Sequence, residues 1–170
     1  EDLEISEENR KNFDIVWNSL QTTENIGERY KYKPLASLVV CASDAIRIRK
    51  LFSLSLQVTN TIIHLYPNLA LEFIVLFCPC NENLGKFYSV FDIPPQMRKF
   101  IRIIELPEEY IDQRKRFFNI TYFPEFDLKN IGIRRAKGEY IFSINSDVIL
   151  PNGFFECVQK QSFSGLTYFR

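Results

Sequence analysis

The chain has 170 residues, of which 46% are hydrophobic and 25% charged, and its formal net charge is zero. These values are typical of one globular domain with a sizeable core, and they argue against nucleic-acid binding through bulk electrostatics. No apolar run reaches the roughly 18–20 residues that a membrane-spanning helix needs, so we expect no membrane segment in this chain.

The first 33 residues are polar and charged, and they predict an N-terminal helical extension. Its apolar side chains recur at helical spacing, at Phe13, Val16, Trp17 and Leu20. The composition shifts at Pro34, and we expect the main domain to occupy residues 34–170. Because the chain starts without Met and ends without a polar tail, we expect an excised domain that is incomplete at its carboxyl end. A cytoplasmic and a lumenal location both remain open.

The main domain alternates apolar runs of strand length with stretches of helical length. The predicted strands are 35–43, 71–79, 99–107 and 139–144, and charges in the third of these place it at the flank of the sheet. The predicted helices are 45–66 and 127–137, while 108–118 is helical or irregular. Asp127 suits the N-cap position of the second helix, and Gly138 suits the C′ position after it. This alternation predicts an α/β fold with a mostly parallel sheet and helices on both faces.

Small or polar residues directly follow three of the predicted strands. They are Ala42-Ser43-Asp44, Pro79-Cys80-Asn81 and Asn145-Ser146-Asp147. Ligands of parallel sheets bind at the carboxyl ends of the strands, so we expect a ligand site where these residues meet. The chain has neither a GxGxxG run after its first strand nor a GxxxxGK[ST] run, which argues against a dehydrogenase of the Rossmann type and a P-loop enzyme.

Asn145 and Asp147 are candidate metal ligands. They supply an amide oxygen and a carboxylate two residues apart, which an extended strand would place on one side. Mg²⁺ or Mn²⁺ typically takes one or two carboxylates together with substrate phosphates. The alternative is that both side chains stabilise a turn before Pro151.

The helix before the fourth strand carries candidate phosphate ligands. Lys129 and Asn130 are expected in its first turn, where free N–H groups and the helix dipole favour an anion. Arg134 and Arg135 follow about one turn later, and the planar fork of either could reach a diphosphate. The alternative is an ordinary solvated basic face.

Residues 129–155 resemble the nucleotide-sugar-binding half of GT-A-fold glycosyltransferases, most closely the family-two type. That family commonly shows an N-x-G-x-x-x-A-x-G-x-[YF]-[IL] run followed by a D-x-D-like triplet. The run is matched here by Asn130, Gly132, Ala136, Gly138, Tyr140 and Ile141, and the triplet by Asn145-Ser146-Asp147. The resemblance extends more weakly over residues 36–170, and it implies a GT-A, Rossmann-like nucleotide-diphospho-sugar transferase fold.

The resemblance also implies roles for single residues. Ala42, Ser43 and Asp44 would line the base and ribose, and Asn81 would contact the base. Asp147, helped by Asn145, would bind Mn²⁺ or Mg²⁺ on the diphosphate of a UDP- or GDP-linked sugar. The sequence departs from the family pattern in two places, because Asn145 replaces the first acid of the triplet and "CPCNEN" replaces a pair of acids after the second strand.

The implied activity is transfer of the sugar to an unknown acceptor, with inversion. In the family the general base lies well beyond the triplet, in the acceptor-binding half, so no catalytic base is assigned in this chain. The alternative is a catalytically inactive GT-A-like domain that serves binding or scaffolding within a larger protein.

Overall fold

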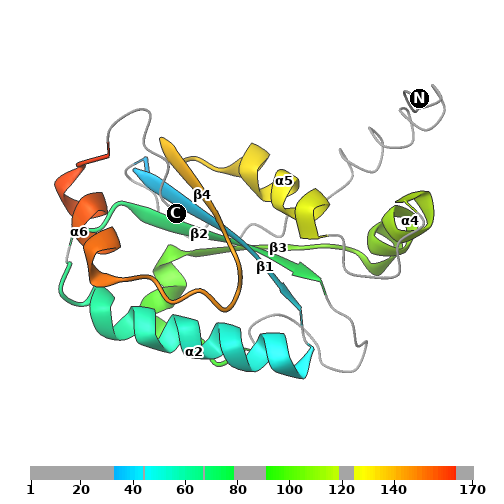
Figure 1. Cartoon of the computed structure of the whole chain (residues 1–170), viewed down its shortest axis with the longest axis horizontal. Helices are drawn as coiled ribbons and strands as arrows, with labels where there is room; N and C mark the ends of the chain where they lie inside the picture. Colours follow the sequence, from blue (N-terminus) through cyan, green and yellow to red (C-terminus); the bar gives the residue numbers. More distant parts are fainter. Residues whose placement is uncertain (1–32, 44, 67, 79–90, 119–124, 164–170) are drawn as a thin grey trace.

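The computed structural model describes residues 33–163, except residues 44, 67, 79–90 and 119–124 (Figure 1). The described strands are β1 (Ala36–Ser43), β2 (Leu71–Cys78), β3 (Ile101–Glu105) and β4 (Tyr140–Ile144). The described helices are α2 (Ile46–Ile63), the 3₁₀ helix η1 (Pro95–Phe100), α4 (Glu108–Phe118), α5 (Glu125–Arg135) and α6 (Asn152–Lys160). The strands form one parallel sheet flanked by helices, which confirms the predicted α/β class. The predicted N-terminal helix lies outside the described residues.

The strand order of the sheet is β3-β2-β1-β4. The chain moves from β1 outward through β2 to β3, and then returns to the other side of β1 to form β4. The direction of travel therefore reverses between β1 and β4, which makes this the topological switch point of the sheet. Right-handed crossovers place the connecting helices on opposite faces when the direction reverses, so α2 and α5 should cover different faces.

Two hydrophobic cores confirm that arrangement. Helices α2 and α6 bury Phe52, Leu56 and Phe155 against one face of the sheet. Helices α4 and α5 bury side chains against the other face, among them Leu128 and Ile131. Every residue of β1 is buried, as a continuous apolar run predicts for a central strand covered on both faces.

Strands β3 and β4 form the two edges of the sheet, so the flanking position predicted for the third strand is confirmed. Strand β4 alternates half-buried and exposed residues, and its Ile141 is 43% exposed.

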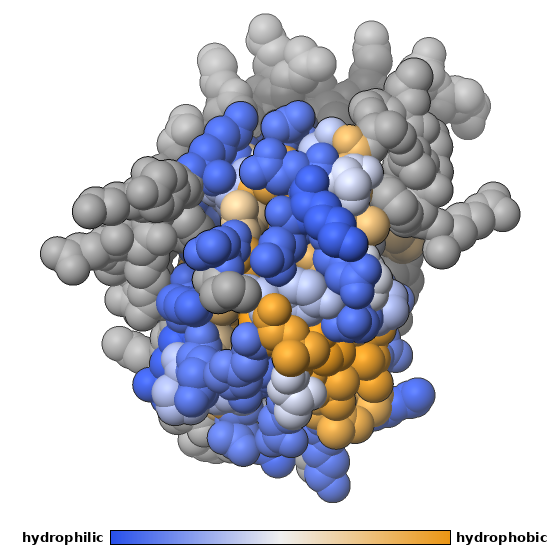
Figure 2. Space-filling view, turned by 90° about the vertical axis from the view of Figure 1, so that its left-hand side faces the viewer, coloured by the Kyte–Doolittle hydropathy of each residue, from blue (hydrophilic) through white to orange (hydrophobic). Residues whose placement is uncertain are grey.

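The face of the molecule around α6 is mainly hydrophilic, with a continuous apolar area on it (Figure 2). None of the described helices combines the length and the hydropathy of a membrane span.

Several element boundaries differ from the predicted ones. The third strand begins at Ile101, because Pro94 and Pro95 start a 3₁₀ helix that runs through Phe100. Helix α5 begins at Glu125 and ends at Arg135, so Asp127 lies inside its first turn and is not the N-cap. Helix α6 was not among the predicted helices, although Phe155 and Val158 are buried and Phe154 and Cys157 pack against the same core.

Gly138 has a different role from the predicted one. It follows the end of α5 by three residues, so it does not occupy the C′ position. Its N–H donates to the hydroxyl of Ser37 at 2.8 Å. A Cβ atom built on Gly138 would lie 2.7 Å from the backbone nitrogen of Ser37 and 2.8 Å from the carbonyl carbon of Ala36. The glycine is required because the chain approaches the start of β1 this closely.

A buried polar network joins the amino ends of the strands to the segment between α5 and β4. Glu72 is fully buried, and its Oε1 accepts from the Ser37 hydroxyl at 2.6 Å and from the Lys137 N–H at 2.7 Å. Arg102, 6% exposed, lies 3.8 Å from Glu72 Oε2 and donates to the carbonyl of Arg135. The network fixes the carboxyl end of α5 and therefore the entry of the chain into β4.

Candidate functional site

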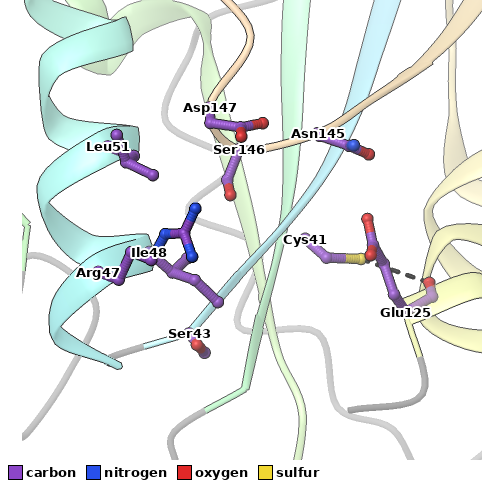
Figure 3. Close-up of a pocket in the computed structure, with 9 residues that line it drawn as sticks. All are labelled: Cys41, Ser43, Arg47, Ile48, Leu51, Glu125, Asn145, Ser146 and Asp147. Carbon is purple, nitrogen blue, oxygen red and sulfur yellow. Dashed lines mark hydrogen bonds between the residues drawn. The ribbon is translucent and has the colours of Figure 1, made fainter. Parts of the chain in front are cut away.

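A cavity of about 350 Å³ opens at the carboxyl edge of the sheet, where β1 and β4 end (Figure 3). Its walls come from β1, α2, α5 and the turn after β4. The lining residues are Cys41, Ser43, Arg47, Ile48, Leu51, Glu125, Asn145, Ser146 and Asp147. The cavity therefore lies at the switch point, where sheets of this kind bind their ligands.

The Asn145-Ser146-Asp147 triplet forms a turn. Strand β4 ends at Ile144, and the Val148 N–H donates to the Asn145 carbonyl at 3.2 Å. On the α2 side, the Ser55 hydroxyl donates to the carbonyl of Val148. The alternation of an extended strand therefore does not apply to Asn145 and Asp147, and the Asn145 amide points toward α5, away from Asp147 (Figure 3).

Lys129 holds the same turn from the α5 side. The side chain lies in the second turn of α5, one turn later than predicted, and the residue is only 8% exposed. Its ammonium nitrogen donates to Asn145 Oδ1 at 2.7 Å and forms an ion pair with Glu125 Oε1, also at 2.7 Å. Glu125 and Lys129 are four residues apart on the helix, the spacing at which such pairs meet. Lys129 thus neutralises Glu125 and fixes Asn145.

Arg47 is one of the cavity residues that the sequence interpretation missed, together with Cys41, Ile48, Leu51 and Glu125. It lies in the first turn of α2, and its guanidinium extends into the cavity toward Ser146 (Figure 3). It makes no hydrogen bond or ion pair with another described residue, and the same holds for the carboxylate of Asp147. The position of Arg47 in the sequence could have indicated this role. A basic residue at the start of the helix that follows a central strand lies at the carboxyl edge of the sheet.

Cys41 forms part of the cavity wall and is not an activated nucleophile. Burial, reinforced by the nearby charge of Glu125, raises the pKa of its thiol from 9.0 to about 12. Its sulfur donates to the carbonyl of Glu125 at 3.6 Å (Figure 3). A thiol with so high a pKa stays protonated near neutrality and is a poor nucleophile.

The structure brings together only part of the predicted site. Ser43, Asn145 and Asp147 line the cavity, and Lys129 contacts Asn145. Ala42 is buried in the hydrophobic core on the α2 face instead of lining the cavity.

Three other predicted ligands, Asn130, Arg134 and Arg135, are not brought to the cavity. Asn130 is an exposed residue of α5 that does not line the cavity. Arg134 and Arg135 end α5 near the amino edge of the sheet, where the carbonyl of Arg135 accepts from Arg102. Asp44 and Asn81 lie outside the described residues.

The two predicted metal ligands fit that role unequally. Asp147 offers an exposed carboxylate at the cavity, and one carboxylate with substrate phosphates can hold Mg²⁺ or Mn²⁺. Asn145 does not fit, because its oxygen already accepts from a lysine ammonium. Within the described part of the chain, no three His, Cys, Asp or Glu residues form a group that could hold a metal ion.

Comparison with known proteins finds no protein family, no curated protein and no solved structure that matches the chain.

Proposed function

We propose that this chain is the nucleotide-sugar-binding part of a GT-A-like glycosyltransferase. The ligand is a UDP- or GDP-linked sugar bound in the cavity, and the reaction is transfer of the sugar to an acceptor with inversion. The observation that carries the proposal is the position of the cavity at the switch point between β1 and β4. The motif over residues 129–155 supports it, because the triplet that ends this motif forms one wall of the same cavity.

Arg47 is the residue that we assign to the diphosphate. A planar guanidinium can donate two parallel hydrogen bonds to phosphate oxygens, and Arg47 extends into the cavity without a partner among the described residues. The first turn of α2 adds free backbone N–H groups, which favour an anion at the same place. Ser43 and Ser146 offer hydroxyl groups for the ribose or the sugar.

Charge stabilisation is the catalytic contribution expected of these residues. The diphosphate gains negative charge as the bond to the sugar breaks, and a fixed guanidinium offsets that charge in the transition state. Mn²⁺ or Mg²⁺ is predicted from the sequence only; if an ion were bound, Asp147 would be its carboxylate ligand and it would supply Lewis-acid stabilisation of the diphosphate. The group that deprotonates the acceptor hydroxyl is not assigned.

A second candidate is a domain that binds the nucleotide without transferring the sugar. The contact between Lys129 and Asn145 favours it, because this contact occupies an oxygen that the family motif assigns to the metal ion. The two candidates differ in one observable. A transferase releases free nucleotide from the sugar nucleotide, whereas a binding domain returns it unchanged.

Calorimetric titration with UDP, GDP and CDP tests the proposal, and Arg47→Gln is the decisive variant. Loss of a charge-assisted hydrogen bond costs about 1.5–3 kcal/mol, so we expect Arg47→Gln to weaken binding of the preferred nucleotide roughly 10–100-fold. Arg49→Gln is the matched control, because Arg49 lies two residues along α2 and does not line the cavity. Equal losses in both variants, or no binding of any nucleotide at millimolar concentration, would contradict the proposal.

A further inference from the structure

We infer that Lys129 takes the place of a divalent ion at Asn145, so that the cavity binds its nucleotide diphosphate without a metal. This inference rests on the proposed function for the identity of the ligand. The contacts of the Lys129 ammonium group with Asn145 Oδ1 and Glu125 Oε1 do not depend on the proposed function.

The geometry around Lys129 resembles that of a small cation site. One oxygen from α5 and one from the turn after β4 converge on the ammonium nitrogen, each at 2.7 Å. The two 2.7 Å distances are those of charge-assisted hydrogen bonds and are longer than the about 2.0–2.1 Å of Mg²⁺–oxygen and about 2.3–2.6 Å of Ca²⁺–oxygen contacts. The ammonium group therefore fills the space between the two oxygens that an ion would have to enter. The ammonium group places one positive charge at this point, and Glu125 balances it.

The charge balance of the cavity opposes a second cation at this point. The positive charge of Lys129, which is 8% exposed, repels any ion that approaches Asn145 Oδ1, although solvent at the exposed Asn145 screens part of this repulsion. Lys129 also neutralises Glu125, the carboxylate nearest to Asn145 in its hydrogen-bonded network. Asp147 remains the carboxylate at the cavity without a partner among the described residues.

Arg47 then supplies the charge that faces the ligand. It reaches the cavity from α2, whereas Lys129 approaches the turn from α5. The protein therefore offers one cation directly to the phosphate groups and a second that keeps the Asn145 turn in place. Arg47 thus offsets part of the diphosphate charge without an ion at Asn145.

The test is nucleotide binding measured in EDTA and in Mn²⁺, for the unaltered chain and for Lys129→Met. We expect the affinity of the unaltered chain to differ less than about twofold between the two conditions. Lys129→Met keeps the aliphatic stem but frees Asn145 Oδ1 and Glu125 Oε1 for an ion. We expect its binding to fall about tenfold in EDTA and to recover in Mn²⁺.

Lys160→Met is the matched control. Lys160 pairs with Glu156 four residues earlier on α6, as Lys129 pairs with Glu125 on α5, but this pair is exposed. We expect the Lys160→Met chain to bind nucleotide equally in both conditions. If the unaltered chain needs Mn²⁺ for binding, the inference is wrong.

A separate arm uses Mn²⁺ alone, with the free ion measured by electron paramagnetic resonance. We expect Lys129→Met to bind more Mn²⁺ than the unaltered chain, and the added variant Asn145→Ala to remove the gain. No gain in Lys129→Met would overturn the inference. Because this arm needs no nucleotide, it separates a failure of the inference from a failure of the proposed function. If Lys129→Met does not fold, Lys129→Gln replaces it in both arms.

Discussion

At the scale of single residues, two glycines act through close packing and not through unusual backbone angles. Gly132 lies on the buried face of α5, where an added Cβ would be 2.5 Å from a methyl group of Val39 and 2.6 Å from one of Leu76. Gly138 meets backbone atoms of β1 instead, and these cannot move aside as a side chain can. Both glycines therefore set the distance between the α5–β4 segment and the sheet.

Gly138→Ala should destabilise the protein strongly. Inserting one methyl group into a packed region typically costs about 1–3 kcal/mol, and contact with the backbone places this site at the upper end. Gly153→Ala is the control, because its Cβ meets nothing within 4 Å and Gly153 lies in α6, where Ala gains about 0.5–1 kcal/mol over Gly. Urea unfolding of both variants measures the difference. Equal stabilities would show that close approach is not the reason for Gly138.

At the scale of elements, strand β4 is held at both ends, through the segment before it and the turn after it. The network of Ser37, Glu72 and Arg102 fixes the carboxyl end of α5 at the amino edge of the sheet. At the other edge, Lys129 and Ser55 hold the turn that follows β4. The cavity wall formed by this turn is thus positioned by α2 and α5 before any ligand arrives.

Arg102→Met should cost far more stability than a typical loss of an arginine. The change leaves the fully buried Glu72 carboxylate without its cationic partner, and breaking a buried pair in this way costs about 3–5 kcal/mol. Arg116→Met on the exposed part of α4 should change stability by less than about 0.5 kcal/mol. Chemical unfolding checks both values. If Arg102→Met proves as mild as Arg116→Met, Glu72 does not depend on Arg102.

The strands with long apolar runs and the longer helices could be predicted from the sequence, whereas the short helices η1 and α6 were not predicted. A continuous apolar run such as that of β1 indicates a strand buried on both faces. The observed strand begins one residue after the predicted one. Helix α6 has nine residues, fewer than the roughly 10–12 at which periodicity separates a helix from another short apolar segment. Asp127 was a plausible N-cap by residue type, but the helix includes two residues before it.

At the scale of the whole molecule, the spatial order of the strands decides where the site lies. The sequence predicts four strands, but it does not say that β4 returns to the side of β1 opposite β2. For the same reason Arg47 was missed, since its role depends on α2 lying beside the turn after β4. Arg134 and Arg135 were predicted near the site, but α5 runs antiparallel to the strands. Its last residues therefore lie at the amino edge of the sheet, opposite the cavity.

The most direct test of the central claim is an amide-resolved NMR titration of the chain with UDP and with GDP. A ligand at the switch point should shift the amide signals of the residues that line the cavity, among them Ser43, Arg47, Ile48, Leu51 and residues 145–147. Signals of residues 135–140, at the amino edge of the sheet, should stay unchanged. Shifts confined to the amino edge, or no shifts with either nucleotide at millimolar concentration, would contradict a nucleotide-sugar site at the carboxyl ends of β1 and β4.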